Sequence, residues 1–266
     1  MYKYESQIDK YDEVYKKSEY TELEVPDYKI TNGINVSGKN IFVVGAGTAR
    51  DVKFLIPKNK VVAADYSISA VKHLKSLGID AFLADLNNPI AKIKNKSMDI
   101  VVAKDILEHL EKPSVLMSEI ARILKPKGYA VLDVPNHFFL PMRMRILFGN
   151  NLIWKTIDHN HTKDFKEWDY MHKIFFTWKG FQEFIKEHGL VVSKNFWDFG
   201  TLNHYSQPEM VMYHLKNKNN KLVANIASVI WSIFNFVLPR SLRSFTVSLS
   251  PSLFCASFYV WVRPKK

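Results

Sequence analysis

Short apolar runs alternate with helical periodicity through the first half of the chain. The runs contain almost no polar residue, which is typical of strands buried on both faces, and they cover residues 40–44, 60–64, 81–84 and 98–103. Apolar residues at helical spacing lie in the intervening segments, around residues 51–55, 71–77 and 116–124. Strands that alternate with helices predict an α/β fold with a mostly parallel sheet and helices on both faces.

Helix boundaries follow from the residues that flank these segments. Ser67 or Ser69 is suited to cap a helix that ends before Gly78. Pro113 begins the next helix, and the KPKG sequence at 125–128 is expected to end it before a strand over 129–134.

The second half has a looser pattern. Thr177 is expected to cap a helix that ends at Gly189, and strands are predicted over 190–199 and 253–262, which completes a seven-stranded sheet. We therefore expect one domain over 1–266 with two insertions, at 137–177 and 201–251. Loops this long usually serve function, and ligands of open α/β sheets bind beyond the carboxyl ends of the strands.

Charge and cysteine content narrow the setting. The net charge of +11 favours anionic partners, but the lysines are scattered, so nucleic acid is not favoured as a partner. Cys255 is the only cysteine and the opening residues do not form a signal peptide, so we expect a cytoplasmic protein. The oligomeric state is left open.

Residues suited to bind a nucleoside follow the first strands. Gly45, Ala46 and Gly47 let the backbone approach a ligand, although a nicotinamide dinucleotide fold also begins this way. Asp65 ends the second strand, where a carboxylate either accepts the hydrogen bonds of a ribose diol or caps the following helix. Tyr66 either stacks on adenine or packs on that helix.

Asp85, after the third strand, has two interpretations. It either accepts hydrogen bonds from an adenine amino group, with Leu86 covering the ring, or forms an Asx-turn. A dinucleotide fold does not require a carboxylate here. The position therefore favours adenosine bound without a second nucleotide.

Taken in order, the segments FVVGAGTARD, VVAADYS, FLADLNN and MDIVVAKDILEHLEKPSVLMSEIARILKPKGYAVLDVPN resemble the successive motifs of class I S-adenosylmethionine-dependent methyltransferases. They cover residues 38–136 with normal spacing, and YMHKIFFTWKGFQEFIKEHG resembles a later segment of the same family. Within this family, the motifs most resemble those of ubiquinone-biosynthesis O-methyltransferases and of methyltransferases encoded in glycan gene clusters. The resemblance implies a Rossmann-like fold and S-adenosylmethionine as cofactor.

The resemblance also implies roles for individual residues. It places Gly45, Ala46 and Gly47 along the methionine part and Asp65 at the ribose. It places the remaining cofactor residues at the adenine (Tyr66, Asp85 and Leu86) and beside the cofactor at the end of the fourth strand (Lys104 and Asp105). Val43 stands where the family has an acidic residue that faces the methionine ammonium, and Ala49 replaces a third glycine, a change expected to be sterically mild.

Transfer of a methyl group to a hydroxyl needs positioning and a base that removes the proton. His109, His137 and His172 are the candidate bases, because all three are expected near the carboxyl edge of the sheet. Each has an alternative structural role, in which a backbone carbonyl satisfies the ring. Glu108 with His109, or His159 with His161, lacks a third ligand at a recognised spacing, so no metal is predicted.

Two terminal segments are candidates for lids and membrane contact. The N-terminal residues 1–36, with Tyr4, Tyr11 and Tyr15, are expected to form a helical lid or to pack on the core. The segment 222–239 predicts an apolar helix with a narrow polar stripe and basic flanks, from Lys216, Lys218 and Lys221 to Arg240 and Arg243. Such a helix lies at a membrane interface, packs on the domain or forms a dimer interface.

Together these features predict an enzyme that transfers a methyl group from S-adenosylmethionine to an oxygen of a small-molecule, glycan or lipid-linked acceptor. A tRNA methyltransferase is a rival that the charge favours and the apolar second insertion opposes. The other rival is a methyltransferase-like binding or scaffold protein without catalysis, for which Val43 is the support.

Overall fold

The computed structural model describes residues 34, 36–49, 52–149, 172–195, 225–226, 229, 237, 240–255 and 257–265. The predicted lid over 1–36, most of the insertion at 137–177 and nearly all of the apolar segment 222–239 therefore lie outside the described residues. The chain divides into two compact units, and each is described by itself. The first holds residues 1–133, 183–194 and 260–266, and the second holds 134–182 and 195–259.

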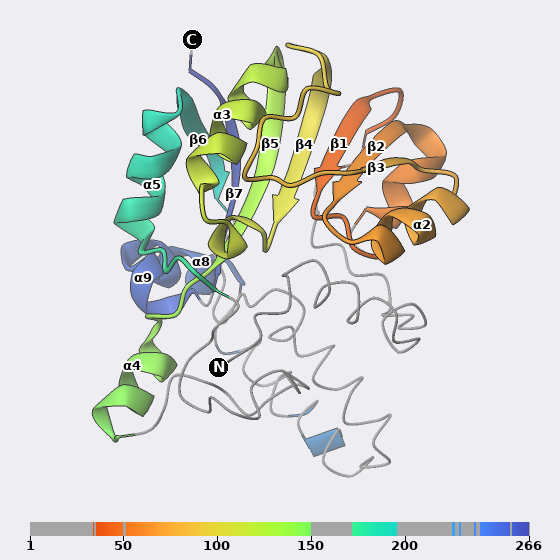
Figure 1. The fold of residues 1–266 in the computed structure, drawn as a ribbon. Coiled ribbons are helices and arrows are strands. Elements are labelled where there is room, and N and C mark those ends of the chain that lie inside the picture. The colour runs from red at the N-terminus through yellow and green to blue at the C-terminus, as the bar shows by residue number, and fades with distance from the viewer. Residues whose placement is uncertain are drawn as a thin grey trace, which may run out of the picture. The chain divides into compact units, whose positions relative to one another are not determined.

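A seven-stranded sheet in the order β3-β2-β1-β4-β5-β7-β6 lies mostly in the first unit (Figure 1). The strands are β1 (Asn40–Val44), β2 (Lys60–Asp65), β3 (Asp80–Leu83), β4 (Met98–Lys104), β5 (Leu124–Pro135), β6 (Leu190–Asn195) and β7 (Ser257–Pro264). The pairs β1–β2, β1–β4, β2–β3 and β4–β5 are parallel. The predicted Rossmann-like α/β fold with a mostly parallel sheet is confirmed.

The helices are α2 (Ile68–Ser76), α3 (Pro113–Ile123), α4 (Leu140–Leu147), α5 (Trp178–Glu187), α8 (Arg240–Leu249) and α9 (Pro251–Phe254). The Ser67 hydroxyl accepts a hydrogen bond from the Ala70 amide and caps α2, so Ser67 rather than Ser69 is the cap. The Thr177 hydroxyl likewise accepts from the Gly180 amide at the start of α5, as predicted.

Three predicted boundaries are wrong. The segment after β1 forms a 3₁₀ helix over Lys53–Lys58, because Pro57 has no amide hydrogen for an α-helical bond. The KPKG sequence belongs to β5, since α3 already ends at Ile123. The last strand begins at Ser257 rather than at residue 253, because Pro251–Phe254 forms α9.

Buried apolar side chains fill the space between the sheet and its helices. α3 buries one face, with Leu116, Met117, Ile120 and Ile123 all inaccessible to solvent. On the outer side of this layer, Arg122 donates to both Glu119 carboxylate oxygens and to the backbone carbonyls of Ile90 and Ile93. The loop between β3 and β4 is thereby bonded to the last turn of α3.

Candidate active site

The turn after β1 brings the backbone to the carboxyl end of the sheet. Gly45 and Gly47 both have left-handed backbones, with φ of +61° and +50°. A Cβ atom at Gly45 would lie 2.7 Å from Cδ1 of Ile106. Glycine is therefore required at Gly45 by backbone conformation, and a side chain there would also crowd Ile106.

Ala49 follows in the same turn and also has a positive φ, of +58°, while its side chain is buried. The left-handed region costs a residue with a Cβ roughly 1–2 kcal/mol. The sequence predicts that alanine in place of the third glycine is sterically mild. This prediction is wrong, because the backbone of Ala49 is strained.

Asp65 ties this turn to the end of β2. Its Oδ2 accepts a hydrogen bond from the Gly47 amide at 2.8 Å, and its Oδ1 accepts from the Ser67 amide at 2.9 Å. The side chain is buried. Each carboxylate oxygen can accept more than one hydrogen bond, so the two bonds that shape the turn do not by themselves exclude a ligand at Asp65.

A cavity of about 180 Å³ lies at this edge of the sheet. Its lining consists of Gly45, Asp65, Tyr66, Asp85, Leu86, Asn87, Asp105, Ile106, His109 and Leu110. Six of the predicted cofactor residues thus line one cavity together with His109. Ala46, Gly47 and Lys104 do not line it, although Gly47 contributes through its bond to Asp65.

Asp85 and Asn87 hold the wall of the cavity that follows β3. Asp85 Oδ1 accepts from the backbone and side-chain nitrogens of Asn87, both at 2.9 Å, and Oδ2 accepts from Asn88. This is the Asx-turn that the sequence left as an alternative to adenine binding.

Asn87, which the sequence did not single out, in turn accepts from the amides of Glu111 and Lys112, both at 2.9 Å. The sequence signal that could have identified Asn87 is its position two residues after Asp85 in the segment FLADLNN.

The phenol of Tyr66 faces the same acidic wall. Its pKa lies above the usual value, first because burial disfavours the phenolate and then because Asp85 and Glu111 are negatively charged. The tyrosine is therefore a neutral, half-buried ring at the cavity. A flat neutral ring in this position is suited to contact a base.

Acidic groups gather where β4 and β5 end. The Asp105 amide donates to the Asp133 carbonyl at 3.1 Å, and the Lys104 ammonium lies 3.2 Å from the Asp105 carboxylate. Glu108 is almost fully buried beside them. Its pKa is raised well above the usual value by burial, and further by the charges of Asp105 and Asp133, against the opposing charge of Lys104.

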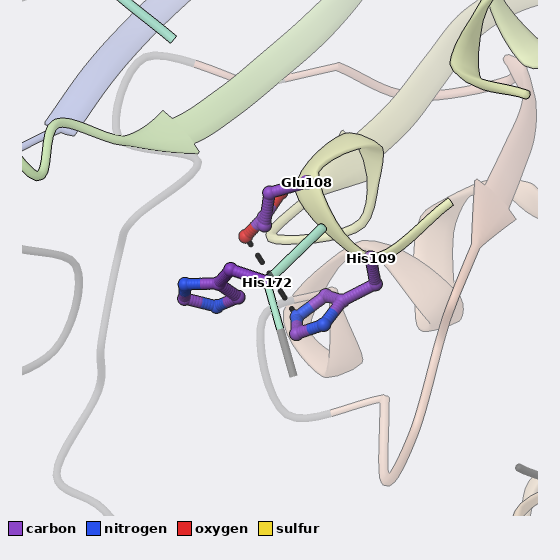
Figure 2. Close-up of side chains that lie close together, drawn as sticks. All are labelled: Glu108, His109 and His172. Carbon is purple, nitrogen blue, oxygen red and sulfur yellow. Dashed lines mark ion pairs between the residues drawn. The ribbon is translucent and has the colours of Figure 1, made fainter. Parts of the chain in front are cut away.

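Glu108 also faces His109. Its Oε1 lies 3.8 Å from Nε2 of His109, and Figure 2 marks this ion pair with a dashed line. His109 lines the cavity, whereas Glu108 lies behind it. A base that removes a proton acquires positive charge, and the acidic groups around Glu108 favour that charge electrostatically.

His172, which Figure 2 also labels, belongs to the second unit together with His137. There Nε2 of His137 lies 2.8 Å from Nδ1 of His172, and the ring of Phe175 packs edge-on against His137. One of the two bonded nitrogens donates and the other accepts, so the accepting nitrogen carries no proton. The three candidate bases therefore divide into a single histidine at the cavity and a bonded pair.

The donor set fits S-adenosylmethionine. The turn at Gly45 has no room for a side chain, so the backbone can approach the methionine chain of the cofactor. The carboxylates of Asp65 and Asp85 at successive strand ends are suited to bind an adenosine. The ring of Tyr66 and the apolar side chain of Leu86 are suited to contact its base. Residues 42–132, which contain this cavity, match the family described as a methyltransferase domain.

A probable S-adenosylmethionine-dependent methyltransferase of Mycobacterium tuberculosis is 29% identical over 100 residues, which cover 37% of this chain and 36% of that protein. The match thus spans about a third of the length of this curated relative. An S-adenosylmethionine-dependent methyltransferase structure from Archaeoglobus fulgidus is 14% identical with a TM-score of 0.50 over 86% of both chains. The cyclase SpnF is 14% identical with a TM-score of 0.50, over 97% of this chain and 81% of its own.

The structural likenesses show the fold alone. Residues 42–132 are similar to a methyltransferase domain, and the mycobacterial relative is a probable S-adenosylmethionine-dependent methyltransferase, so both matches agree with the predicted class of enzyme. The subgroup and the acceptor are finer statements than these matches carry.

Proposed function

We propose that the protein transfers a methyl group from S-adenosylmethionine to an oxygen of a small-molecule, glycan or lipid-linked acceptor. The observation that carries this proposal is the shared cavity, in which His109 lies with Gly45, Asp65 and Asp105. A histidine close to the cofactor residues is suited to take a proton from a hydroxyl acceptor.

The chain's own residues would hold the cofactor along the cavity. The turn at Gly45 lies along the methionine part, Asp65 accepts from the ribose hydroxyls, and Tyr66 and Leu86 enclose the adenine. Asp85 remains a candidate for the adenine amino group, although its Asx-turn already uses both oxygens as acceptors. When bound, S-adenosylmethionine supplies an electrophilic methyl group on a sulfonium.

Asp105 is the carboxylate suited to replace the acid that is missing at Val43. Val43 is buried within β1 and offers no charge, whereas Asp105 lines the cavity with a partly exposed carboxylate. A charge-assisted hydrogen bond to an ammonium contributes roughly 1.5–3 kcal/mol. Asp105 would therefore restore the contact that the family obtains from β1.

His109 is proposed as the base. A ring nitrogen of His109 would take the proton of the acceptor hydroxyl as the methyl group passes to its oxygen, the sulfur–methyl bond breaks and S-adenosylhomocysteine is left. His109 would then give that proton to water. The negative charges of Asp105 and Asp133, which also raise the pKa of Glu108, favour the charged ring during this step. The His137–His172 pair is the alternative base, and comparison of single variants distinguishes the two.

A methyltransferase-like binding protein without catalysis is a second candidate, and Val43 favours it. Binding of S-adenosylmethionine without any methyl transfer would support this candidate.

The proposed activity is tested by incubating the protein with methyl-labelled S-adenosylmethionine and fractionated cell extract, lipid fractions included. Label in a product whose methyl group resists mild acid but is released by ether-cleaving conditions would support an oxygen acceptor. The Gly45→Val variant serves as the control for nonenzymatic transfer. Absence of label from every fraction, with cofactor binding intact, would contradict the proposal.

A further inference from the structure

Two helices of the second unit carry large apolar side chains on their outer faces. On α8, Phe245 and Leu249 are 62% and 70% exposed, whereas Val247 on the opposite face is buried. On α4, Leu147 is 73% exposed and Met142 is buried. Both helices are therefore docked through one apolar face and present a second apolar face to solvent.

The exposed apolar side chains on each helix are spaced three or four residues apart, so they lie on one side of that helix. Leu140, Met144 and Leu147 follow each other at intervals of four and three residues on α4, and all three are exposed. Phe245 and Leu249 are four residues apart on α8. We call these five side chains the outer apolar face.

The two helices belong to one packed group. α9 contacts both α4 and α8, and the three helices lie together in Figure 1. Asn136, which is buried at the start of this unit, donates to the carbonyls of Ser252 and Cys255 at 3.1 and 2.7 Å. The chain leading into α4 is thus bonded to α9 and to the residue after it, so the outer apolar face belongs to one packed group of helices rather than to isolated segments.

The chain segments that contain α4 and α8 carry charge of one sign. Residues 134–157 contain three Lys or Arg and residues 210–266 contain eight, but neither stretch contains any of the chain's 26 Asp and Glu. The remaining residues hold 26 basic and 26 acidic side chains, so the whole net charge of +11 comes from these two stretches. Arg143 and Arg145 lie within α4, and Arg240 and Arg243 lie within α8.

We propose that the outer apolar face binds peripherally to a bilayer that contains anionic lipid. Apolar side chains with arginines on the same helices match the boundary between acyl chains and negatively charged headgroups. No helix in the described part of the chain is long and apolar enough to span a membrane, which is consistent with binding at the surface. This surface extends the interfacial contact expected for 222–239 to α4 and α8, which the sequence did not indicate.

The charge argues against the two other occupants. A second copy of the chain would bring arginine-bearing, acid-free segments together, and like charges oppose each other at an interface. Nucleic acid would use the positive charge but would gain little from exposed Leu, Met and Phe side chains. The anionic bilayer is the partner that uses both properties.

The full-length protein is tested by cosedimentation with vesicles of phosphatidylcholine alone and with 30% phosphatidylglycerol added. We expect binding to the anionic vesicles only, and a loss of binding at high salt because ions screen the attraction. The double variant Phe245→Ser/Leu249→Ser should lower the partition coefficient at least about tenfold. Arg240→Gln/Arg243→Gln should lower it by roughly fivefold for each charge removed.

The matched control is Ile68→Ser/Leu83→Ser, which removes two comparably exposed side chains from the first unit and should leave vesicle binding unchanged. Circular dichroism and calorimetry with S-adenosylmethionine on every variant separate this proposal from the proposed catalysis, because none of the five side chains lines the cofactor cavity. The proposal would be overturned if the protein bound both vesicle types equally or bound neither. It would also be overturned if the protein formed a dimer that the Phe245→Ser/Leu249→Ser variant dissociates.

Discussion

In the first unit α3 turns Leu116, Ile120 and Ile123 into the core, whereas in the second unit α8 buries Val247 and leaves Phe245 and Leu249 in solvent. Apolar residues at helical spacing are thus buried on α3 but partly exposed to solvent on α8. Around the cofactor cavity, function is carried by polar groups at strand ends, supported by a buried apolar core. In the second unit we infer that function is carried by the apolar side chains themselves.

This difference indicates where substitutions will separate function from stability. Polar residues at the cavity, such as Asp65, also hold the backbone, so their replacement affects both. Side chains of the outer apolar face contribute little to folding, so their replacement should affect partner binding alone.

Replacement of His109 by alanine should lower kcat by roughly 10²–10⁴-fold, the usual contribution of a positioned general base. Cofactor affinity should change far less, because the cavity keeps the three carboxylates of Asp65, Asp85 and Asp105. Turnover with saturating S-adenosylmethionine measures the effect. His188→Ala is the matched control, since that ring bonds the Phe184 carbonyl at 2.7 Å and does not line the cavity. A larger loss in His137→Ala or His172→Ala would transfer the role of base to the bonded pair.

Gly45→Val should weaken cofactor binding on the order of 100-fold, the equivalent of one or two lost hydrogen bonds. Its β-branched side chain would occupy a left-handed position 2.7 Å from Ile106. Gly78→Val is the control, because Gly78 also has a left-handed backbone, with φ of +78°, but a Cβ atom there would have no neighbour within 4 Å. Both variants should lose stability, and calorimetry should show lost cofactor affinity only at Gly45. Unchanged affinity in both would exclude the turn from the cofactor site.

The burial of Glu108 predicts a pH-dependent loss of stability. Its folded pKa is raised above the ordinary value of 4.5, so its contribution is complete below that pH and is lost as pH rises toward the folded pKa. Each unit of upward shift is worth about 1.4 kcal/mol. Glu108→Gln should therefore gain stability relative to wild type between pH 5 and pH 8 in denaturant unfolding. The exposed Glu187→Gln is the control, and parallel pH profiles for all three proteins would refute the assignment.

Ala49→Gly should raise the free energy of unfolding by about 0.5–1 kcal/mol. Relief of the left-handed backbone outweighs the greater flexibility that glycine gives to the unfolded chain. Ala46→Gly, in the same turn but without a positive φ, should instead lower stability by a similar amount. Equal effects of the two substitutions in thermal unfolding would show that Ala49 is not strained.

The sequence was sufficient for features set by local pattern. The positions of the strands follow from the apolar runs, and the helix caps come from Thr177 and from one of the two serines predicted for α2. The convergence of Asp65, Tyr66, Asp85 and Asp105 on one edge follows from the topology of parallel sheets. Each of these depends on a residue and its near neighbours in sequence.

Features set by tertiary contact could not be obtained in this way. The KPKG segment continues β5 because it lies against β4, where a Cβ at Gly128 would meet the Asp99 carbonyl at 2.9 Å. Asn87 became visible only through its bonds to Glu111 and Lys112, which lie 24 and 25 residues away. The outward faces of α4 and α8 required knowledge of which face each helix docks.

Asp65 provides the most direct test of the central claim, which is that the cavity at the ends of β1 and β2 binds S-adenosylmethionine. Asp65→Asn keeps one acceptor oxygen but places an amide group against the Gly47 or Ser67 amide, at a cost of about 1–3 kcal/mol of stability. Asp80→Asn, on the exposed end of β3, is the control.

Isothermal calorimetry at a temperature where all three proteins are folded is the decisive measurement. We expect wild type and Asp80→Asn to bind S-adenosylmethionine with equal affinity, and to bind S-adenosylhomocysteine with equal affinity. We expect Asp65→Asn to bind both ligands at least about tenfold more weakly. Binding by Asp65→Asn that equals wild type, or no binding of either ligand by the wild-type protein, would contradict it.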